Sequence, residues 1–167
     1  FLAAKAKLCE PCVFAKQARH PFFSSEHDKA ARPLALVHMD VCGPLQVTSL
    51  GGSRYFATFL DDYSGYSVVK PVSSKADVAD VVKKVLVAME TATSQVVQVV
   101  RTDRGGEYVN KELASFFESK GIVHQLTTAY TPQQNGAAER LNRTLVEKVR
   151  AMLHDAQLAT NLWAEAV

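Results

Sequence analysis

The sequence has no long hydrophobic run and few cysteines. No stretch of 18 or more apolar residues occurs among its 167 residues, so no membrane-spanning helix is predicted. The opening FLAAKAKLCEPC has too short an apolar stretch for a secretory signal peptide and lacks a small-residue cleavage site. The three cysteines are too few, and odd in number, for a disulfide scaffold. We therefore expect a soluble intracellular protein with no membrane partner.

A large excess of charge is also missing. Lys and Arg number 19 and Asp and Glu 17, and the net charge of +2 is too small to indicate a nucleic-acid binder by itself. Residues 1–32 contain six basic and three acidic side chains, a local net charge of +3, which fits a solvated tail as well as a polyanion contact. The hydrophobic share of 47% is enough for one core, so we expect one main domain.

Hydrophobic periodicity predicts an α/β fold. Alternating or continuous apolar runs indicate strands, and apolar residues three and four apart indicate amphipathic helices. The expected strands are 34–42, 54–61, 65–72, 95–103 and 122–127, and the expected helices are 75–92, 110–120 and 136–154. The apolar side of the last helix is expected to hold Ala138, Leu141, Leu145, Val149 and Met152. The order βββαβαβα predicts a mixed sheet between helices.

Three acidic residues stand at unusual places in this pattern. Asp40 interrupts the apolar strand VHMDVCGPL, where an ionised carboxylate loses its hydration unless a partner compensates for the loss. Asp103 ends the apolar run QVVQVVRTD, and Glu139 falls in the first turn of the last helix. Carboxylates that meet at strand ends repel one another, and their oxygens suit Mg²⁺. The pattern predicts a divalent-metal site for phosphoryl transfer, and acids that only end strands or cap a helix are the alternative.

The residues around these acids resemble a known family. VHMDVCGP, GGSRYFATFLDDYS, RTDRGGEY and YTPQQNGAAERLNRTL occur in the order seen in copia-type long-terminal-repeat retrotransposon integrases (Pseudoviridae), over about residues 9–167. Asp103 and Glu139 have 35 residues between them. The resemblance implies an RNase H-like fold with a central five-stranded mixed sheet. It also implies a catalytic triad of Asp40, Asp103 and Glu139 that binds two Mg²⁺ or Mn²⁺ ions.

The activity implied by this resemblance is that of the integrase core of a retrotransposon Pol polyprotein. Such an enzyme trims the 3′ ends of the element's double-stranded DNA with water, and then uses the new 3′ hydroxyl to attack target DNA. One alternative is a hydrolytic RNase H-like nuclease, which would be expected to have a fourth acid, and Asp61 or Asp62 is the only candidate nearby. The other alternative is a catalytically inactive or host-recruited DNA-binding or assembly module.

The same resemblance sets expectations for partners and location. Double-stranded DNA, as element ends and target, is the expected partner, and the full-length protein is expected to form a homo-multimer. Integration implies the nucleus, preceded by a cytoplasmic virus-like particle, although no targeting signal is visible. The chain has no initiator methionine and stops within an apparent helix, so we expect an excerpt of a longer polypeptide.

Residues 1–32 are expected to be the remnant of an N-terminal zinc-binding module and a basic linker, followed by the catalytic core, truncated at its C-terminus, over 33–167. Cys9 and Cys12 match the second half of the family's His-His-Cys-Cys module, whose two upstream histidines are absent. His20 and His27 have a spacing that departs from common zinc sites. We therefore expect an incomplete zinc site, with Zn²⁺ bound only in the full-length module.

Seven further residues are candidates for contact with DNA. The loop YTPQQNG offers neutral donors and acceptors and touches DNA in related integrases, although a plain turn before a helix is the alternative. Arginines on the following helix suit phosphate oxygens, or alternatively pair with glutamates on the same helix. The candidates are Arg104, Gln133, Gln134, Asn135, Arg140, Arg143 and Arg150.

The remaining polar residues are expected to be structural. Asp61 and Asp62 are expected to end a strand or accept hydrogen bonds rather than bind metal. His38 and His124 lie in predicted strands and are expected to be core histidines with satisfied hydrogen bonds. Trp163 is expected to pack against the core.

Overall fold

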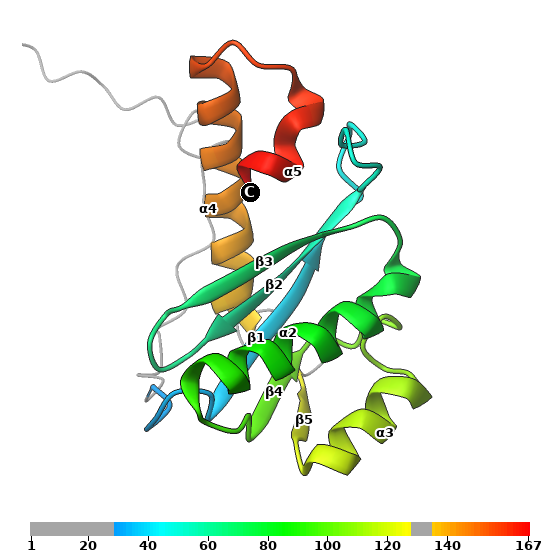
Figure 1. The fold of residues 1–167 in the computed structure, drawn as a ribbon, viewed down its shortest axis with the longest axis vertical. Helices are drawn as coiled ribbons and strands as arrows, with labels where there is room; N and C mark the ends of the chain where they lie inside the picture. The colour runs from blue at the N-terminus through cyan, green and yellow to red at the C-terminus, as the bar shows by residue number, and fades with distance from the viewer. Residues whose placement is uncertain (1–28, 128–134) are drawn as a thin grey trace, which may run out of the picture.

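The computed structural model describes residues 29–127 and 135–167, which form one mixed five-stranded sheet with helices on both faces (Figure 1). The strands are β1 (Leu36–Cys42), β2 (Tyr55–Asp61), β3 (Ser67–Val72), β4 (Val99–Thr102) and β5 (Val123–Leu126). The helices are η1 (Lys75–Asp77), α2 (Val78–Thr93), α3 (Lys111–Lys120), α4 (Gly136–Asp155), η3 (Thr160–Leu162) and α5 (Trp163–Ala166). The predicted order βββαβαβα is confirmed.

The sheet has the strand order β3-β2-β1-β4-β5. The first three strands form an antiparallel meander, and β4 and β5 run parallel to β1. A short turn at Asp62–Gly65 joins β2 to β3, as the hairpin signal predicted. The parallel crossovers through α2 and α3 place the carboxyl ends of β1 and β4 next to each other. Polar groups at these two strand ends therefore meet at one edge of the sheet.

Two hydrophobic clusters lie on opposite faces of the sheet, because successive side chains of a strand point to opposite sides. On one face, Ala57 and Met39 belong to the cluster covered by α2 and α3. On the other face, Phe56 packs with Val149 of α4 and with Trp163, whose ring centroid lies 6.3 Å from that of Phe56. Burial of each such side chain stabilises the fold by roughly 1.5–3 kcal/mol. The packing of Trp163 confirms its predicted role.

Local signals account for the helix ends. Ser74 and Asp77 form a capping box at η1, directly before α2. The Ser74 side chain accepts a hydrogen bond from a backbone amide of the first turn, and the Asp77 side chain accepts one from the Ser74 amide. The Asn110 side chain accepts from the Leu113 amide at the start of α3, and Gly121 ends that helix with φ +67°. None of the described helices is long and apolar enough to cross a membrane.

Two details of the sequence prediction are wrong. The expected strand 95–103 pairs only over β4, Val99–Thr102. The inward side of α4 includes Leu153, which is 7% exposed, whereas Met152 is 48% exposed. Both deviations concern tertiary contacts, namely strand pairing and helix packing, which local sequence patterns do not reveal.

Candidate active site

Asp40 lies where the central strand extends past its neighbour. Strand β1 pairs with β2 as far as Cys42, and Asp40 faces Thr58 in that register. Its parallel pairing with β4 ends at His38, which is level with Arg101. Asp103 directly follows the end of β4 at Thr102, so it lies near the part of β1 that contains Asp40. The edge of β1 is open on this side, as the sequence predicted.

Asp103 is fixed by the turn that follows β4. Its Oδ1 accepts a hydrogen bond of 2.9 Å from the Gly105 amide. A Cβ atom at Gly105 would lie 3.0 Å from this oxygen and 2.7 Å from the Glu107 carboxyl carbon, so a side chain there would displace one or both carboxylates. Asp103 itself is exposed. Its carboxylate is therefore held in place and accessible to a ligand.

Helix α4 brings Glu139 to the same end of the sheet. Asp40 and Glu139 line one open depression of about 470 Å³. The Asn142 side chain, one turn after Glu139, donates a 2.8 Å hydrogen bond to Asp40 Oδ2. Asn135, just before the helix, donates a 3.2 Å hydrogen bond to the Met39 carbonyl. These two amides attach the start of α4 to β1, and the sequence analysis did not identify Asn142.

The three carboxylates act on one another electrostatically. Burial, followed by the negative charge of Asp103, raises the pKa of Asp40 from its ordinary value of 3.8 to about 6, and the charge of Glu139 acts in the same direction. The Val41 amide and the Asn142 side chain oppose this increase because they stabilise the ionised form. Asp103 and Glu139 thus both act on the Asp40 carboxyl through their charge, and the assignment of the three acids as catalytic residues stays a prediction.

We expect Asp40→Asn to increase the free energy of unfolding at pH 7.5, without divalent ions, by about 1–2 kcal/mol. A carboxyl whose pKa is about 6 in the fold ionises later than in the unfolded chain. Wild-type stability therefore falls as the pH rises from about 4 to about 6, and the loss persists above that window. Urea unfolding at pH 4 and pH 7.5 measures the effect, which should be absent at the lower pH. Asp80→Asn on exposed α2 is the control, and an Asp40→Asn protein less stable than wild type at pH 7.5 would contradict the argument.

The donor set is chemically suited to a hard divalent cation. Carboxylate oxygens are the protein ligands that Mg²⁺ and Mn²⁺ prefer, and a cation removes the repulsion that raises the pKa of Asp40. Among residues 29–127 and 135–167, no three His, Cys, Asp or Glu side chains already converge closely enough to hold a metal ion. Asp40, Asp103 and Glu139 therefore fit a metal by their chemistry, and binding requires the three carboxylates to draw together.

The arginines predicted to contact DNA lie in different surroundings. Arg143 and Arg150 are exposed and line the depression with Asp40. Arg140 is exposed beside the first turn of α4, where its guanidinium lies next to Gly136. Arg104 Nε donates a 3.1 Å hydrogen bond to the Thr127 carbonyl, although the residue as a whole is exposed.

The prediction for Asn135 is wrong, whereas Gln133 and Gln134 lie outside the described residues. The Asn135 side chain is 3% exposed, and its amide binds the backbone of β1. A side chain so buried positions helix α4 and does not face DNA. Sequence reasoning placed the start of the helix correctly at residue 136, but it could not show that the side chain just before the helix turns inward.

Asp61 and Asp62 have the hydrogen-bonding roles that the sequence predicted. Asp61 is 2% exposed and accepts from the Leu34 and Ser64 amides. Asp62 Oδ1 lies 3.0 Å from His38 Nε2. Because their carboxylates are engaged in these contacts, neither is a fourth acid of the proposed metal site, which removes the feature expected of a ribonuclease H.

The two strand histidines differ in burial. His38 is 1% exposed, and this burial lowers its pKa even though the Asp62 hydrogen bond acts in the opposite direction. His124 is half-buried, and its Nε2 lies 2.8 Å from Thr102 Oγ1. Both have structural roles, but the prediction of satisfied hydrogen bonds is wrong for His38, whose buried Nδ1 has no partner among the described residues. Cys9, Cys12, His20 and His27 lie outside the described residues, so the incomplete zinc site and the boundary at residue 33 stay predictions.

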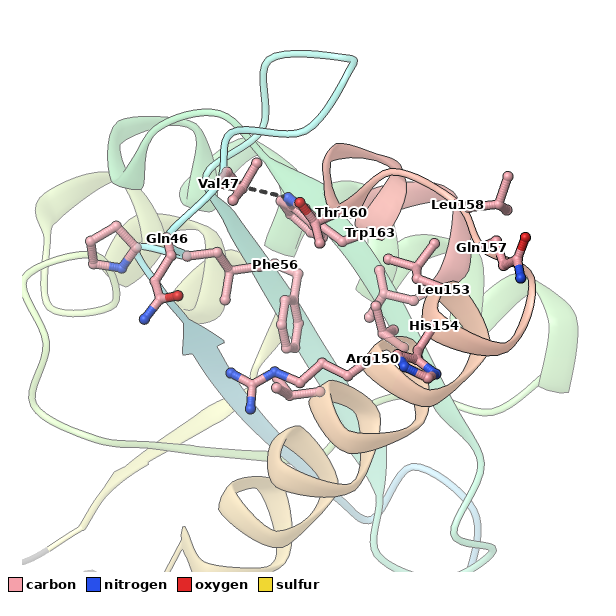
Figure 2. A pocket seen from close by; sticks show the side chains of 15 residues that line it. Gln46, Val47, Phe56, Arg150, Leu153, His154, Gln157, Leu158, Thr160 and Trp163 are labelled. Atoms are coloured by element: carbon pink, nitrogen blue, oxygen red, sulfur yellow. Dashed lines mark hydrogen bonds between the residues drawn. The ribbon is translucent and has the colours of Figure 1, made fainter.

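A second, largely apolar pocket of about 850 Å³ lies between α4, α5 and the segment after β1 (Figure 2). Its lining includes Phe56, Leu153 and Trp163, and the Trp163 indole donates a 2.9 Å hydrogen bond to the Val47 carbonyl. Arg150 lines both this pocket and the depression that contains Asp40. No acidic residue lines the apolar pocket, so the carboxylate chemistry belongs to the depression.

These observations define the class of the protein as an RNase H-like α/β domain that gathers acids at the carboxyl ends of its central parallel strands. The chain belongs to the integrase core domain family, because the model of this family matches residues 30–132. This span ends before α4. Membership in the integrase family that its motifs resemble is thereby confirmed.

A relative among known proteins supports this assignment. The chain is 44% identical over 161 residues to the retrovirus-related Pol polyprotein from transposon TNT 1-94 of Nicotiana tabacum. The match covers 96% of this chain and 12% of that polyprotein, so the chain spans only a small part of its relative. This likeness confirms a long-terminal-repeat retrotransposon integrase core.

The fold matches a chain in the cryo-EM structure of the simian T-cell lymphotropic virus intasome in complex with the PP2A regulatory subunit B56 gamma. The TM-score is 0.63 at 18% sequence identity, over 83% of this chain and 48% of that chain. At this identity the likeness concerns the fold alone, and it confirms the RNase H-like architecture.

Proposed function

We propose that this domain is the catalytic core of a DNA integrase, a polynucleotidyl transferase that trims DNA 3′ ends and joins them to target DNA. The observation that supports the proposal is that acids from separate elements lie near one end of the sheet in a member of the integrase core domain family. Asp40 of β1 and Glu139 of α4 line one depression, and the charge of Asp103, which follows β4, acts on Asp40.

In the proposed reaction, a water molecule or a DNA 3′ hydroxyl attacks a phosphodiester phosphorus. A new phosphorus–oxygen bond forms as the bond to the leaving 3′ oxygen breaks, and the nucleophile's proton passes to solvent while the leaving oxygen gains one. Cleavage and joining are the same displacement with different nucleophiles. No covalent bond to the protein is needed, so the side chains act by positioning and by charge.

Asp40, Asp103 and Glu139 would hold two Mg²⁺ or Mn²⁺ ions. When bound, these ions would supply positive charge for the attacking and leaving oxygens of the phosphodiester. The Asn142 amide donates a hydrogen bond to the Asp40 carboxylate and the Gly105 amide donates one to that of Asp103, so each of these two side chains is partly oriented before any ion binds. Side chains that are already oriented lose less conformational freedom on binding.

We propose that double-stranded DNA approaches along α4. Arg143 and Arg150 are exposed beside Asp40 and can pair with phosphate oxygens through two parallel hydrogen bonds. Arg140 and Arg104 flank the same site, and Gln133 and Gln134 stand in the segment between β5 and α4. Assembly as a homo-multimer on paired DNA ends, and integration in the nucleus after a cytoplasmic particle stage, belong to the same proposal for the longer protein.

A strand-transfer assay distinguishes this function from its alternatives. The chain is incubated with a labelled DNA duplex in Mg²⁺ or Mn²⁺, and the products are separated by length. An integrase core is expected to give products both shorter and longer than the substrate, because it cleaves and joins. Shortened products alone would indicate a hydrolytic nuclease, and a gel shift with no new product would indicate a DNA-binding module, and either result would contradict the proposal.

A further inference from the structure

The hydroxyl of Thr102 lies between the Asp103 backbone and an imidazole from the neighbouring strand. Thr102 is the last residue of β4 and is 0% exposed. Its Oγ1 lies 2.7 Å from the Asp103 carbonyl oxygen and 2.8 Å from Nε2 of His124 in β5. A carbonyl oxygen only accepts hydrogen bonds, so the hydroxyl donates its one proton to Asp103. Nε2 of His124 therefore donates to the hydroxyl oxygen, and the imidazole carries a proton on that nitrogen.

The His124 ring is itself held by packing. Strand β5 is at the edge of the sheet, and α3 lies against it (Figure 1). The ring of His124 meets that of Phe117 in α3 edge to face, with the two centroids 5.0 Å apart. Burial lowers the pKa of His124 and so favours the neutral ring, which has one N–H to donate. The packing against α3 therefore gives the hydrogen bond to Thr102 a defined direction.

The residues on both sides of Asp103 are attached to the segment after β5. The Thr127 amide donates a 2.9 Å hydrogen bond to the Thr102 carbonyl, and the Thr127 carbonyl accepts one of 3.1 Å from Arg104 Nε. The Thr102 hydroxyl restricts backbone rotation at Asp103, because it binds the carbonyl of that residue. The Gly105 amide restricts side-chain rotation, because it donates to Oδ1. Separate groups thus restrain the backbone and the carboxylate of Asp103.

We propose that His124 and Thr102 are positioning residues of the acidic site, which hold the Asp103 backbone so that its carboxylate is presented to a divalent cation. This inference rests on the proposed function, because it assumes that Asp103 is a metal ligand. His124 acts through the Thr102 hydroxyl, and Thr102 acts through the Asp103 carbonyl, so neither side chain needs to contact the cation. Groups that orient a metal ligand in this way contribute strongly to metal affinity.

Thr102→Val tests this role, because it replaces the hydroxyl with a methyl group of similar size. Titration with Mn²⁺ alone, followed by calorimetry, is expected to show a dissociation constant raised roughly 10-fold in the variant. Thr102→Ser keeps the hydroxyl and should bind Mn²⁺ nearly as tightly as wild type, a rescue that a threonine serving only to fill space would not show. A folded Thr102→Val protein with wild-type affinity for Mn²⁺ would overturn the proposal.

Thr91→Val is the matched control for this substitution. Thr91 is exposed on α2, and its hydroxyl also donates a hydrogen bond to a backbone carbonyl, that of Val87, at 2.9 Å. The same change of hydroxyl to methyl at this position should leave the affinity for Mn²⁺ unchanged. An equal loss of affinity in Thr91→Val would show that the effect of Thr102→Val is not local, and would overturn the proposal.

His124→Phe keeps an aromatic ring against Phe117 and removes the donor to Thr102. We expect it to raise the dissociation constant for Mn²⁺ in the wild-type background and to add nothing in the Thr102→Val background, because His124 acts through the hydroxyl. Equal losses in the two backgrounds would overturn the role of His124. The single variant also supplies the affinity test if Thr102→Val does not fold, and wild-type affinity would then overturn the proposal.

A further measurement uses the metal-free wild-type protein. Nitrogen-15 NMR of the imidazoles at mildly alkaline pH, assigned by the signals lost in His124→Phe, is expected to show the proton of His124 on Nε2. A proton on Nδ1 would overturn this chain of hydrogen bonds while leaving the metal site intact. Failure of the wild type to bind Mn²⁺ at all would instead overturn the proposed metal site, and this inference with it.

Discussion

Asp103→Asn is expected to abolish both cleavage and joining of DNA, by on the order of 10³-fold or more, while the domain remains folded. An amide is isosteric with the carboxylate but carries no negative charge, so it cannot neutralise a divalent cation. The Asp103 side chain is exposed and makes one backbone hydrogen bond, to the Gly105 amide, which an asparagine oxygen can also accept. The change therefore removes chemistry and leaves the turn intact.

The measurement is the strand-transfer assay in Mg²⁺, with circular dichroism to verify the fold. Asp40→Asn and Glu139→Gln should give the same loss of both products, because the three acids are expected to act as one ligand set. Asp80→Asn and Glu118→Gln, on exposed faces of α2 and α3, are the matched controls and should retain activity. Substantial activity of the folded Asp103→Asn protein in Mg²⁺ would show that the metal-ligand assignment is wrong.

Asp61→Ala is expected to lower the free energy of unfolding by about 3 kcal/mol. The Asp61 carboxylate is 2% exposed and accepts hydrogen bonds from the Leu34 and Ser64 amides. Leu34 is buried with φ +60°, a left-handed conformation that is unfavourable for leucine and that the hydrogen bond to Asp61 helps to hold. Removing the carboxylate leaves the buried Leu34 amide unpaired where the chain enters β1, and it also removes the acceptor of the Ser64 amide after β2.

Urea unfolding measures this loss of stability, and two further variants test its cause. Asp61→Asn keeps one acceptor oxygen and should lose less stability than Asp61→Ala. Asp80→Ala, which removes only an exposed ion pair with Lys83, should change the free energy by less than about 0.5 kcal/mol. If Asp61→Ala instead proved stable and lost only metal-dependent activity, Asp61 would be a fourth acid of the site and the hydrolytic nuclease would become the favoured function.

Much of the fold follows from local pattern because the signals are short in range. The stripe of valines in α2, the alternation in β1 and the Asn110 and Gly121 helix ends each arise within one or two turns of chain. Strand β4 was overextended in the sequence prediction, since the residues Gln95–Gln98 are apolar enough for a strand but have no ladder to join. Pairing partners are a tertiary property, and no local pattern reveals them.

The same distinction holds in the candidate site. The three acids stood out because each one interrupts or ends an apolar pattern, where an unpaired charge is costly. Asn142 escaped notice because a polar residue on a long polar helix is ordinary until its amide is seen to bind Asp40. Asn135 was assigned to DNA for the opposite reason, since a loop sequence does not show which of its amides turns inward.

By itself, the sequence determined the order of the elements, the integrase family and the identity of the acids, because these depend on residue type and spacing along the chain. The tertiary structure alone decided that β1 and β4 run side by side, that α4 is attached to β1 by two amides, and that the Tyr108 hydroxyl is buried without a hydrogen-bond partner among the described residues. Those facts depend on strand register and on the burial of groups far apart in sequence, which the packing of the whole domain decides.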